Sequence, residues 1–137
     1  HDIAYAINST NFPPNTWVHM AAVRSGGIVK LYVNGNTVGT PASYNSSNAN
    51  LTGDTPTVGS LFTYSGYINN GSMSNIRLTK SALYTANFTP PTSPLSSLAN
   101  TVLLLLASSS TTAYADSSGT NGTYVNATLP TYSSDHP

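Results

Sequence analysis

The side chains that could act as acids or bases are few in this chain of 137 residues. Its only carboxylate side chains are Asp2, Asp54, Asp116 and Asp135, and it has no Glu. Hydrolysis of a glycosidic bond uses two carboxyl groups held roughly 5 to 10 Å apart, whereas the nearest two Asp are nineteen positions apart in the sequence. The acidic cluster of a glycan-cleaving enzyme is therefore missing, and we expect no catalytic activity.

Nucleophilic catalysis also lacks its usual residues. The chain has no Cys, which excludes thiol catalysis, disulfides and cysteine metal sites. Ser is abundant, but no Gly-x-Ser-x-Gly motif occurs, and His1 and His136 lie near the chain ends. His19 alternates with Trp17 along a predicted strand, so we favour a packed, hydrogen-bonded histidine over a catalytic one.

Oxygen ligands for calcium occur at two places. Asp54 lies near Asn48, Asn50 and Thr52, and Asp116 precedes Ser117 and Ser118. Calcium needs several converging oxygen atoms. The alternative, which we favour, is that Asp116 forms an Asx-type turn with its own backbone and Asp54 caps the end of a loop. No other cofactor is expected.

Tyrosine dominates the aromatic residues, with nine Tyr against three Phe and one Trp. A phenol has a flat apolar face and a hydroxyl, which suits stacking on sugars or on protein surfaces. Tyr44, Tyr64 and Tyr67 fall in or near predicted loops, and with Asn48 and Asp54 they are the candidate glycan contacts. The alternative is that these tyrosines fill strand faces in a protein with few charges.

Seven Asn-x-Ser/Thr sequons are candidate glycosylation sites in a eukaryotic secretory host. They begin at Asn8, Asn45, Asn50, Asn70, Asn87, Asn121 and Asn126.

Neutral polar side chains must provide solubility, because the chain has only four cations, four anions and no net charge. Four scattered cations are too few to neutralise a run of phosphates or an anionic membrane. The longest apolar run, Val102 to Ala107, is far shorter than the ~20 residues of a membrane helix. We therefore expect no nucleic-acid binding and no membrane insertion. The 54 Ser, Thr and Asn residues do not repel other copies by charge, so self-association is weakly opposed.

Short apolar segments bounded by Gly, Pro, Asn and Ser predict strands and no long helix. Ser25-Gly26-Gly27 and Asn34-Gly35 predict hairpin turns, which make an antiparallel meander of the strands around them. A long surface loop is predicted at 41–55, an extended segment without strand pairing at 81–95, and a tail at 129–137. The predicted strands are 2–7, 16–24, 28–33, 36–40, 57–62, 66–68, 73–79, 101–107, 112–115 and 124–128. Such a pattern is typical of an all-β, antiparallel sandwich.

Two stretches of the sequence resemble parts of a known domain family. TWVHMAAVRSGG, followed by VKLYVNG, resembles the central hairpin of concanavalin A-like, laminin G-like jelly-roll domains. The segments 66–69, 74–80 and 81–91 resemble the closing strand and tail of these domains in phage tail, virion and bacterial surface proteins. The resemblance covers about residues 16–95 and implies a jelly-roll sandwich. That fold hosts lectins, glycanases and structural modules alike.

The order of the strands departs from that family, because only about fifteen residues precede Trp17. Residues 101–106 and 116–119 resemble the way such domains begin. We expect the main part of the sandwich at 1–100, and at 101–128 strands that complete this domain or an adjacent copy. Permutation, a tandem repeat and strand sharing between copies each explain this order. In a tandem repeat or in strand sharing, an open sheet edge would pair with a strand of another copy. The self-assembly candidates are then Val102, Leu103, Leu104, Leu105 and Leu106.

These observations predict a non-catalytic structural subunit or repeat module of an extracellular assembly, such as a phage fibre, virion surface or bacterial filament. Its partners would be other copies of itself, and its location extracellular or on a virion surface. The alternative is a glycan-binding adhesion domain, which the implied lectin-like fold and the loop tyrosines favour.

Overall fold

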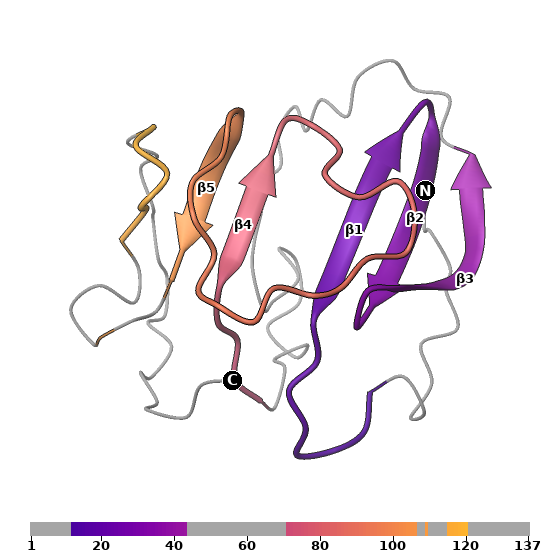
Figure 1. Cartoon of the computed structure of the whole chain (residues 1–137), viewed down its shortest axis with the longest axis horizontal. Helices are drawn as coiled ribbons and strands as arrows, with labels where there is room; N and C mark the ends of the chain where they lie inside the picture. The colour runs from indigo at the N-terminus through magenta and orange to yellow at the C-terminus, as the bar shows by residue number, and fades with distance from the viewer. Residues whose placement is uncertain (1–11, 44–70, 107–108, 110–114, 121–137) are drawn as a thin grey trace, which may run out of the picture. The chain divides into compact units, whose positions relative to one another are not determined.

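A computed structural model describes residues 12–43, 71–106, 109 and 115–120, drawn as the coloured ribbon in Figure 1. These residues contain strands and no helix, hence none that could span a membrane. The strands are β1 (Met20–Ser25), β2 (Ile28–Val33), β3 (Asn36–Ser43), β4 (Ile76–Thr79) and β5 (Thr101–Leu105). All pair antiparallel, in a sheet of order β1-β2-β3 and a separate β4-β5 pair. The prediction of an all-β, antiparallel fold is confirmed.

Contacts divide the chain into two compact units. The first unit comprises residues 1–47 and 80–93, and it holds β1, β2 and β3. The second comprises residues 48–79 and 94–137, and it holds β4 and β5. Each unit is described by itself below.

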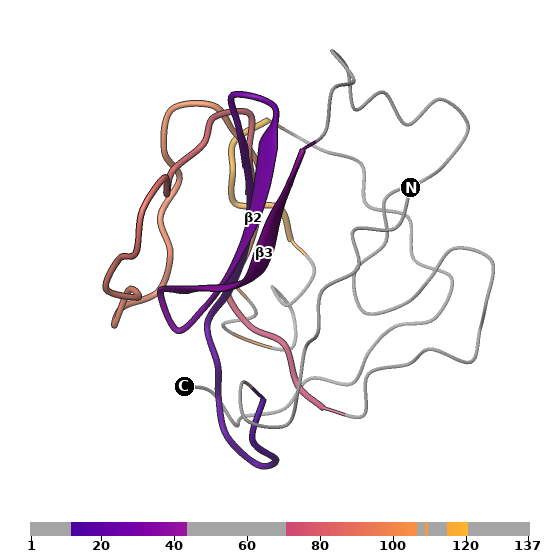
Figure 2. The ribbon, with the colours of Figure 1, turned by 90° about the vertical axis from the view of Figure 1, so that its right-hand side faces the viewer.

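Two tight turns connect the strands of the first unit, as the sequence predicted. Ser25 pairs with Ile28 across Gly26 and Gly27, whose φ angles are 56° and 76°. Asn34 and Gly35, with φ angles of 47° and 79°, connect β2 to β3. Positive φ at both central residues is the feature of the type I′ turn, which fits the twist of a hairpin. Figure 2 shows β2 and β3 side by side.

β3 is longer than predicted, because it continues through Pro41 to Ser43. The predicted loop at 41–55 therefore begins too early. Val29 pairs with Ala42 and Leu31 with Val38, so the ladder is irregular between these pairs and β3 carries extra residues there. Gly39, with φ of 68°, lies in this irregularity. A proline fits an outer strand at such a place, since its missing N–H need not complete the ladder.

The first sheet is partly buried on both faces, and β2 supplies its buried side chains. Along β2, Val29 and Val33 lie on one face and Tyr32 lies on the other. All three side chains are buried, with Tyr32 only 1% exposed. β1 is more open, since Met20, Ala22 and Arg24 are exposed. β2 is thus the central strand of this sheet in burial as well as in pairing.

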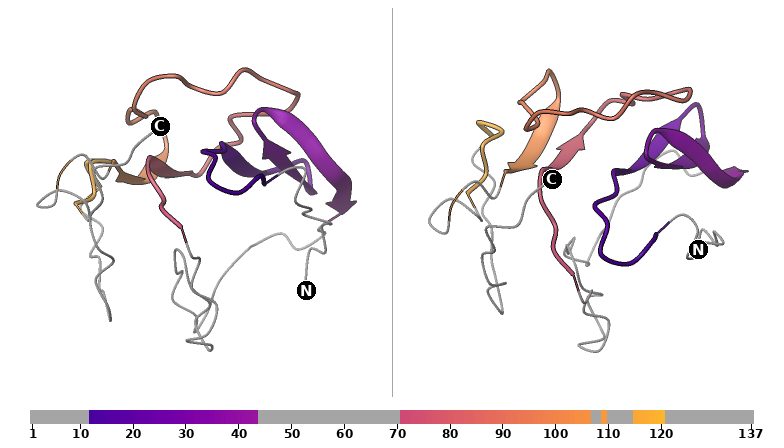
Figure 3. Two further views of the ribbon diagram at one scale, coloured as in Figure 1. Left: turned by 90° about the horizontal axis from the view of Figure 1, so that it is seen from below. Right: turned by 60° about the horizontal axis from the view of Figure 1, so that its bottom comes forward.

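The second unit places the most apolar strand of the sequence against β4. Leu104 is 2% exposed, and Thr101 and Leu105 are also buried. Both strands are shorter than predicted, since residues 73–75 and 106 are outside them. Asn75 has a positive φ of 55° immediately before β4, and a left-handed residue cannot continue an extended strand. Figure 3 shows the β4-β5 pair from two further directions.

The segment 81–95 has no strand, which confirms the predicted extended segment without strand pairing. Its prolines, Pro90, Pro91 and Pro94, cannot donate to a ladder. The predicted strands 2–7, 57–62, 66–68 and 124–128 and the tail 129–137 lie outside the described residues. Of the predicted strand 112–115, only Ala115 is described, and it is not in a strand.

Candidate functional site

Residues 80–93, here called the strap, are bound to the first sheet by several hydrogen bonds. The Phe88 amide donates to the Gly35 carbonyl at 3.0 Å, and the Lys30 ammonium donates to the Thr85 carbonyl at 2.9 Å. The Thr37 amide and hydroxyl both donate to Asn87 Oδ1, each at 3.0 Å. The strap therefore covers β2 and β3 without becoming a strand.

Gly35 allows this close approach. A Cβ atom added there would overlap the Phe88 carbonyl and approach Pro90, and the φ of 79° already favours glycine. Gly35 is thus required for two reasons. The hairpin turn needs its positive φ, and the strap needs the space that a Cβ atom would occupy.

Aromatic rings fill the space between the strap and the sheet. Tyr84 and Phe88 are stacked, with ring centroids 3.5 Å apart and an interplanar angle of 7°. Phe88 meets Tyr32 edge to face at 5.4 Å and His19 at 5.5 Å. His19 is also fixed by its backbone, whose amide donates to Asn34 Oδ1 and whose carbonyl accepts from the Asn34 amide. The imidazole is therefore packed among aromatic rings, as predicted, whereas the hydrogen bonds described here are those of the His19 backbone and do not test the predicted hydrogen bonding of its ring.

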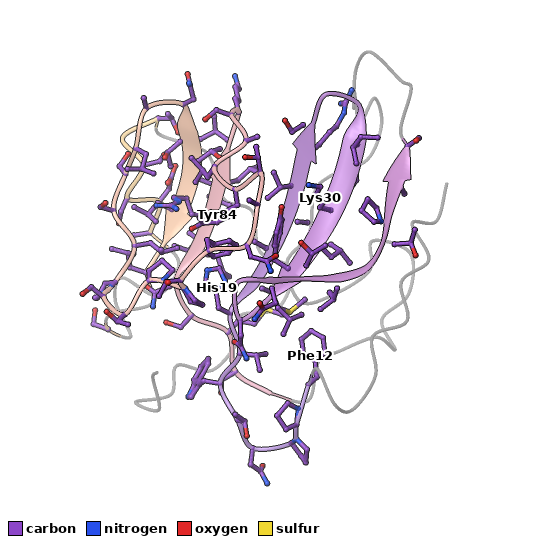
Figure 4. The ribbon with its side chains drawn as sticks, turned by 45° about the vertical axis from the view of Figure 1, so that its right-hand side comes forward. Phe12, His19, Lys30 and Tyr84 are labelled. Carbon is purple, nitrogen blue, oxygen red and sulfur yellow. The ribbon has the colours of Figure 1, made fainter. Side chains whose placement is uncertain are left out.

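A pocket of about 160 Å³ lies beside the strap, between it and the β1-β2 hairpin. Figure 4 labels Lys30, from β2, and Tyr84, from the strap, which both line it. Both residues are half-buried. The complete lining is Val23, Ser25, Ile28, Lys30, Tyr84 and Thr85.

Sequence reasoning missed this pocket, although β2 carries a signal for it. Lys30 alternates with Ile28 and Tyr32 on one face of a strand that is otherwise apolar. A cation among apolar residues on a partly buried face is unusual and points to a specific environment. Tyr84 has no comparable signal, because the strap's position follows from tertiary contacts.

Asp116 forms the center of a second polar cluster, at β5. Its Oδ1 accepts from the Ser118 amide at 2.8 Å, which is the favoured Asx-type turn. Oδ1 also accepts from the Leu104 amide at 3.0 Å, and Oδ2 accepts from the Ser118 hydroxyl at 2.8 Å. This carboxylate therefore connects a turn to a strand.

The segment 116–120, here called the edge cap, bonds to the side of β5 opposite β4. The Leu104 carbonyl accepts from the Ser117 amide at 2.8 Å, and the Val102 carbonyl accepts from the Thr120 hydroxyl at 3.0 Å. Asp116 also forms a bridge with Leu105. Because N–H and C=O of one residue point to the same side of a strand, Leu104 turns its backbone away from β4 and toward the edge cap.

The self-assembly candidates Val102, Leu103, Leu104 and Leu105 are thus in a strand paired with β4 of the same chain, and Leu106 follows it. Strand sharing through the outer edge of β5 would require release of the edge cap. Their role in assembly stays a prediction.

One sequon lies in the described part of the chain. Asn87 Nδ2 is the atom to which an N-glycan would be attached, and it donates to Asn36 Oδ1 at 3.4 Å. Asn87 Oδ1 accepts from the Thr37 amide. Its amide therefore has a structural task at the strap. The sequons at Asn8, Asn45, Asn50, Asn70, Asn121 and Asn126 lie outside the described residues.

The candidate glycan contacts also lie outside them, namely Tyr44, Asn48, Asp54, Tyr64 and Tyr67. Asp54 as a calcium ligand is likewise undescribed. Among the residues that the structure does describe, no three His, Cys, Asp or Glu are grouped as a metal would require.

A family model described as the concanavalin A-like lectin/glucanases superfamily (Laminin_G_3) matches residues 1–87. The chain belongs to this family. The family fold is the β-sandwich that the resemblance implied, and the antiparallel strands of the domain agree with it. The match includes residues 1–16, so the segment before Trp17 belongs to the family region as well. Comparisons with curated proteins and with solved structures found no match.

Proposed function

We propose that this concanavalin A-like domain is a non-catalytic structural module of an extracellular assembly, such as a phage fibre, a virion surface or a bacterial filament. The observation that carries the proposal is the lack of Glu in the whole chain, together with the wide spacing of its four Asp. A glucanase needs two carboxyl groups on either side of the bond that it cleaves.

The role of Asp116 supports the same proposal. Both of its oxygens accept hydrogen bonds from the edge cap or from β5. A catalytic acid would need to reach a substrate, whereas the Asp116 carboxylate accepts hydrogen bonds that stabilise the fold. Three Asp in the rest of the chain would then have to supply any acid chemistry.

Self-association is the second part of the proposal. Charge repulsion between copies is weak, because the chain has no net charge and few charged residues. Large apolar side chains are available for contact, since Met20 is 57% exposed, Leu78 54% and Met73 48%. With only four Lys and Arg, the chain also offers trypsin few cleavage points, which suits a durable exposed polymer.

Sedimentation velocity over a wide concentration range tests self-association. We expect the mean sedimentation coefficient to rise with concentration, and Met20→Ser to reduce that rise because it removes an exposed apolar contact. Thr40→Ser, at an exposed position of β3, is the matched control and should behave like the wild type. A folded monomer at every concentration would refute the self-association.

Incubation of the pure protein with a panel of polysaccharides tests the absence of catalysis. We expect no new reducing ends above the level of a heat-denatured sample. Reproducible turnover that copurifies with the domain would overturn the non-catalytic assignment.

Glycan binding is a second candidate function, which the inclusion of lectins in the family description favours. The tyrosines Tyr44, Tyr64 and Tyr67 remain its candidate contacts. A glycan array with the wild type and with Tyr64→Ala and Tyr67→Ala tests it, and we expect both variants to lose signal. A silent array, or binding that is unchanged in both variants, would remove this candidate.

A further inference from the structure

Asn34 and Gly35 form a pair of residues in which the asparagine can lose its side-chain amide without an enzyme. Glycine has no Cβ atom to hinder its backbone nitrogen, so that nitrogen can attack the side-chain carbonyl carbon of the asparagine before it. The sequence has three Asn-Gly pairs, and Asn34-Gly35 is the one that the structure describes in full. Asn34 is exposed, so water reaches it.

The reaction needs no reagent except water. The Gly35 nitrogen bonds to Asn34 Cγ, its proton passes to the departing amide nitrogen, and ammonia leaves behind a succinimide ring. Water then adds to either ring carbonyl. Opening of one C–N bond gives aspartate, and opening of the other gives isoaspartate, in which the main chain runs through the former side chain. Isoaspartate therefore lengthens the main chain by a methylene group.

The folded turn holds the reacting atoms apart. Ring closure needs the Gly35 nitrogen on the same side of the Asn34 Cα–C bond as the Cβ atom. The φ angles of 47° at Asn34 and 79° at Gly35 are those of a type I′ turn, in which ψ of the first central residue is roughly 30°. At that ψ the Gly35 nitrogen lies nearly opposite Cβ, so it cannot reach Cγ.

Hydrogen bonds hold Asn34 in this geometry. Its amide donates to the His19 carbonyl at 2.8 Å, and its Oδ1 accepts from the His19 amide at 2.9 Å. Its carbonyl accepts from Asn36 Nδ2 at 3.3 Å. Rotation about ψ of Asn34 would break this last bond and move the Gly35 carbonyl away from the Phe88 amide that donates to it. The attack therefore requires the turn to open and to release the strap.

We propose that Asn34 is a latent site of isoaspartate formation, which the closed turn protects and a local opening exposes. Once isoaspartate has formed, the longer main chain no longer fits between Val33 and Asn36, which pair across the turn. The Gly35 carbonyl then cannot return to the Phe88 amide, and the strap stays detached. This modification site does not depend on the proposed structural role.

Mass spectrometry of chymotryptic peptides measures the reaction in the full chain at neutral pH, since fragmentation locates the isoaspartate. Asn70-Gly71 and Asn121-Gly122 are reference pairs with the same two residue types. We expect all three pairs to react at similar rates in denaturing urea. In the folded chain Asn34 should react at least about tenfold more slowly than in urea, because only the open fraction of the turn reacts.

A weaker strap should accelerate the reaction in the folded chain. Asn87→Ala removes the acceptor of the Thr37 amide and hydroxyl, so release of the strap costs less free energy. Asn34 should then react roughly fivefold faster than in the folded wild type. Asn87→Asp keeps that acceptor and is the matched control, which should react at the wild-type rate.

Hydrogen exchange measures the consequence of the reaction. A chain with Asn70→Gln and Asn121→Gln keeps a single Asn-Gly pair, and its isoaspartate form is produced in urea, refolded and purified. We expect the Phe88 amide, which donates to the Gly35 carbonyl, to exchange at least about tenfold faster than before the reaction. Asn34→Asp adds the same charge without lengthening the main chain, so it should keep the original exchange rate.

Several results would overturn the proposal. They are equal rates at Asn34 in the folded chain and in urea, no acceleration by Asn87→Ala, or unchanged exchange at Phe88 in the isoaspartate form. If Asn87→Ala does not fold, the comparison of the folded wild type with urea still decides. An isoaspartate form that fails to refold, while Asn34→Asp refolds, supports the proposal. Self-association is measured on the unreacted chain, so either proposal can fail without the other.

Discussion

The strap in the first unit and the edge cap in the second are both irregular segments that hydrogen-bond to strands, yet they use their polar groups differently. The edge cap uses its polar groups on β5 and within itself, since Asp116 Oδ1 and the Thr120 hydroxyl bond to β5 and Asp116 Oδ2 accepts from the Ser118 hydroxyl. The strap is held by a few bonds and by stacked rings, and the hydroxyls of Tyr84 and Thr85 stay without a partner in the described structure.

This difference separates a segment whose polar groups bond within the fold from one that leaves hydroxyls without a partner in the described structure. Where donors and acceptors already have internal partners, a ligand would have to replace an existing bond. Where donors remain beside an apolar surface, a ligand adds bonds without such a loss. The edge cap therefore stabilises the fold and covers an edge, and the strap builds a pocket wall.

The largest expected loss of stability comes from a side chain at Gly35, where the strap lies against the turn. Gly35→Ala places a Cβ atom against the Phe88 carbonyl at a positive φ, so we expect the first unit to lose about 3 kcal/mol or more of stability. Urea unfolding measures the loss. Gly26→Ala is the matched control, because its φ is also positive but no atom lies within 4 Å of the added Cβ. It should cost about 1 kcal/mol. Equal losses in both variants would show that the strap does not need this close approach.

The next effect tests the edge cap as a structural segment. Asp116→Ala removes the acceptor of the Leu104 amide, of the Ser118 amide and of the Ser118 hydroxyl, and we expect a loss of about 2 to 3 kcal/mol in urea unfolding. It also uncovers the outer edge of the most apolar strand, so light scattering should show more association than in the wild type.

Asp116→Asn is its control, since it keeps Oδ1 as an acceptor while replacing Oδ2. It should lose less stability and associate less than Asp116→Ala. If Asp116→Ala is destabilised but does not associate, the edge cap supports β5 without protecting its edge.

Asn87 tests the attachment of the strap. Asn87→Ala removes the acceptor shared by the Thr37 amide and hydroxyl, and we expect a loss of about 1 to 2 kcal/mol in urea unfolding. Asn87→Asp keeps that acceptor and should retain most of the stability. A loss of the same size in both variants would assign the effect to the bond with Asn36 instead.

Local features of the sequence predicted most of the described fold. Gly26-Gly27 and Asn34-Gly35 specify their turns through positive φ. β2 was predicted with its observed bounds. The Asp116 carboxylate accepts from the amide of Ser118, two positions later, as the predicted Asx-type turn requires. Each of these depends on neighbours in the chain, so a single sequence is sufficient to recognise it.

Features that depend on distant residues were not predicted. The pocket needs Tyr84 and Thr85 to lie beside Lys30, more than fifty positions earlier, and β3 extends past Pro41 because of an irregular ladder with β2. The edge cap combines both kinds of feature, since its turn was expected but its bonds to Leu104 and Val102 were not. Tertiary pairing of irregular segments leaves no periodic signal in the sequence.

The smallest effect sharpens the comparison between the two segments at a single hydroxyl. Thr120→Val removes the hydrogen bond to the Val102 carbonyl but keeps the shape of the side chain, and we expect a loss of about 0.5 to 1.5 kcal/mol in urea unfolding. Thr85→Val is the matched change on the strap, where the hydroxyl has no partner in the described structure, and it should leave stability nearly unchanged. If Thr85→Val costs as much as Thr120→Val, the Thr85 hydroxyl also stabilises the fold, and the distinction between the bonded hydroxyls of the edge cap and the unbonded ones of the strap fails at this position.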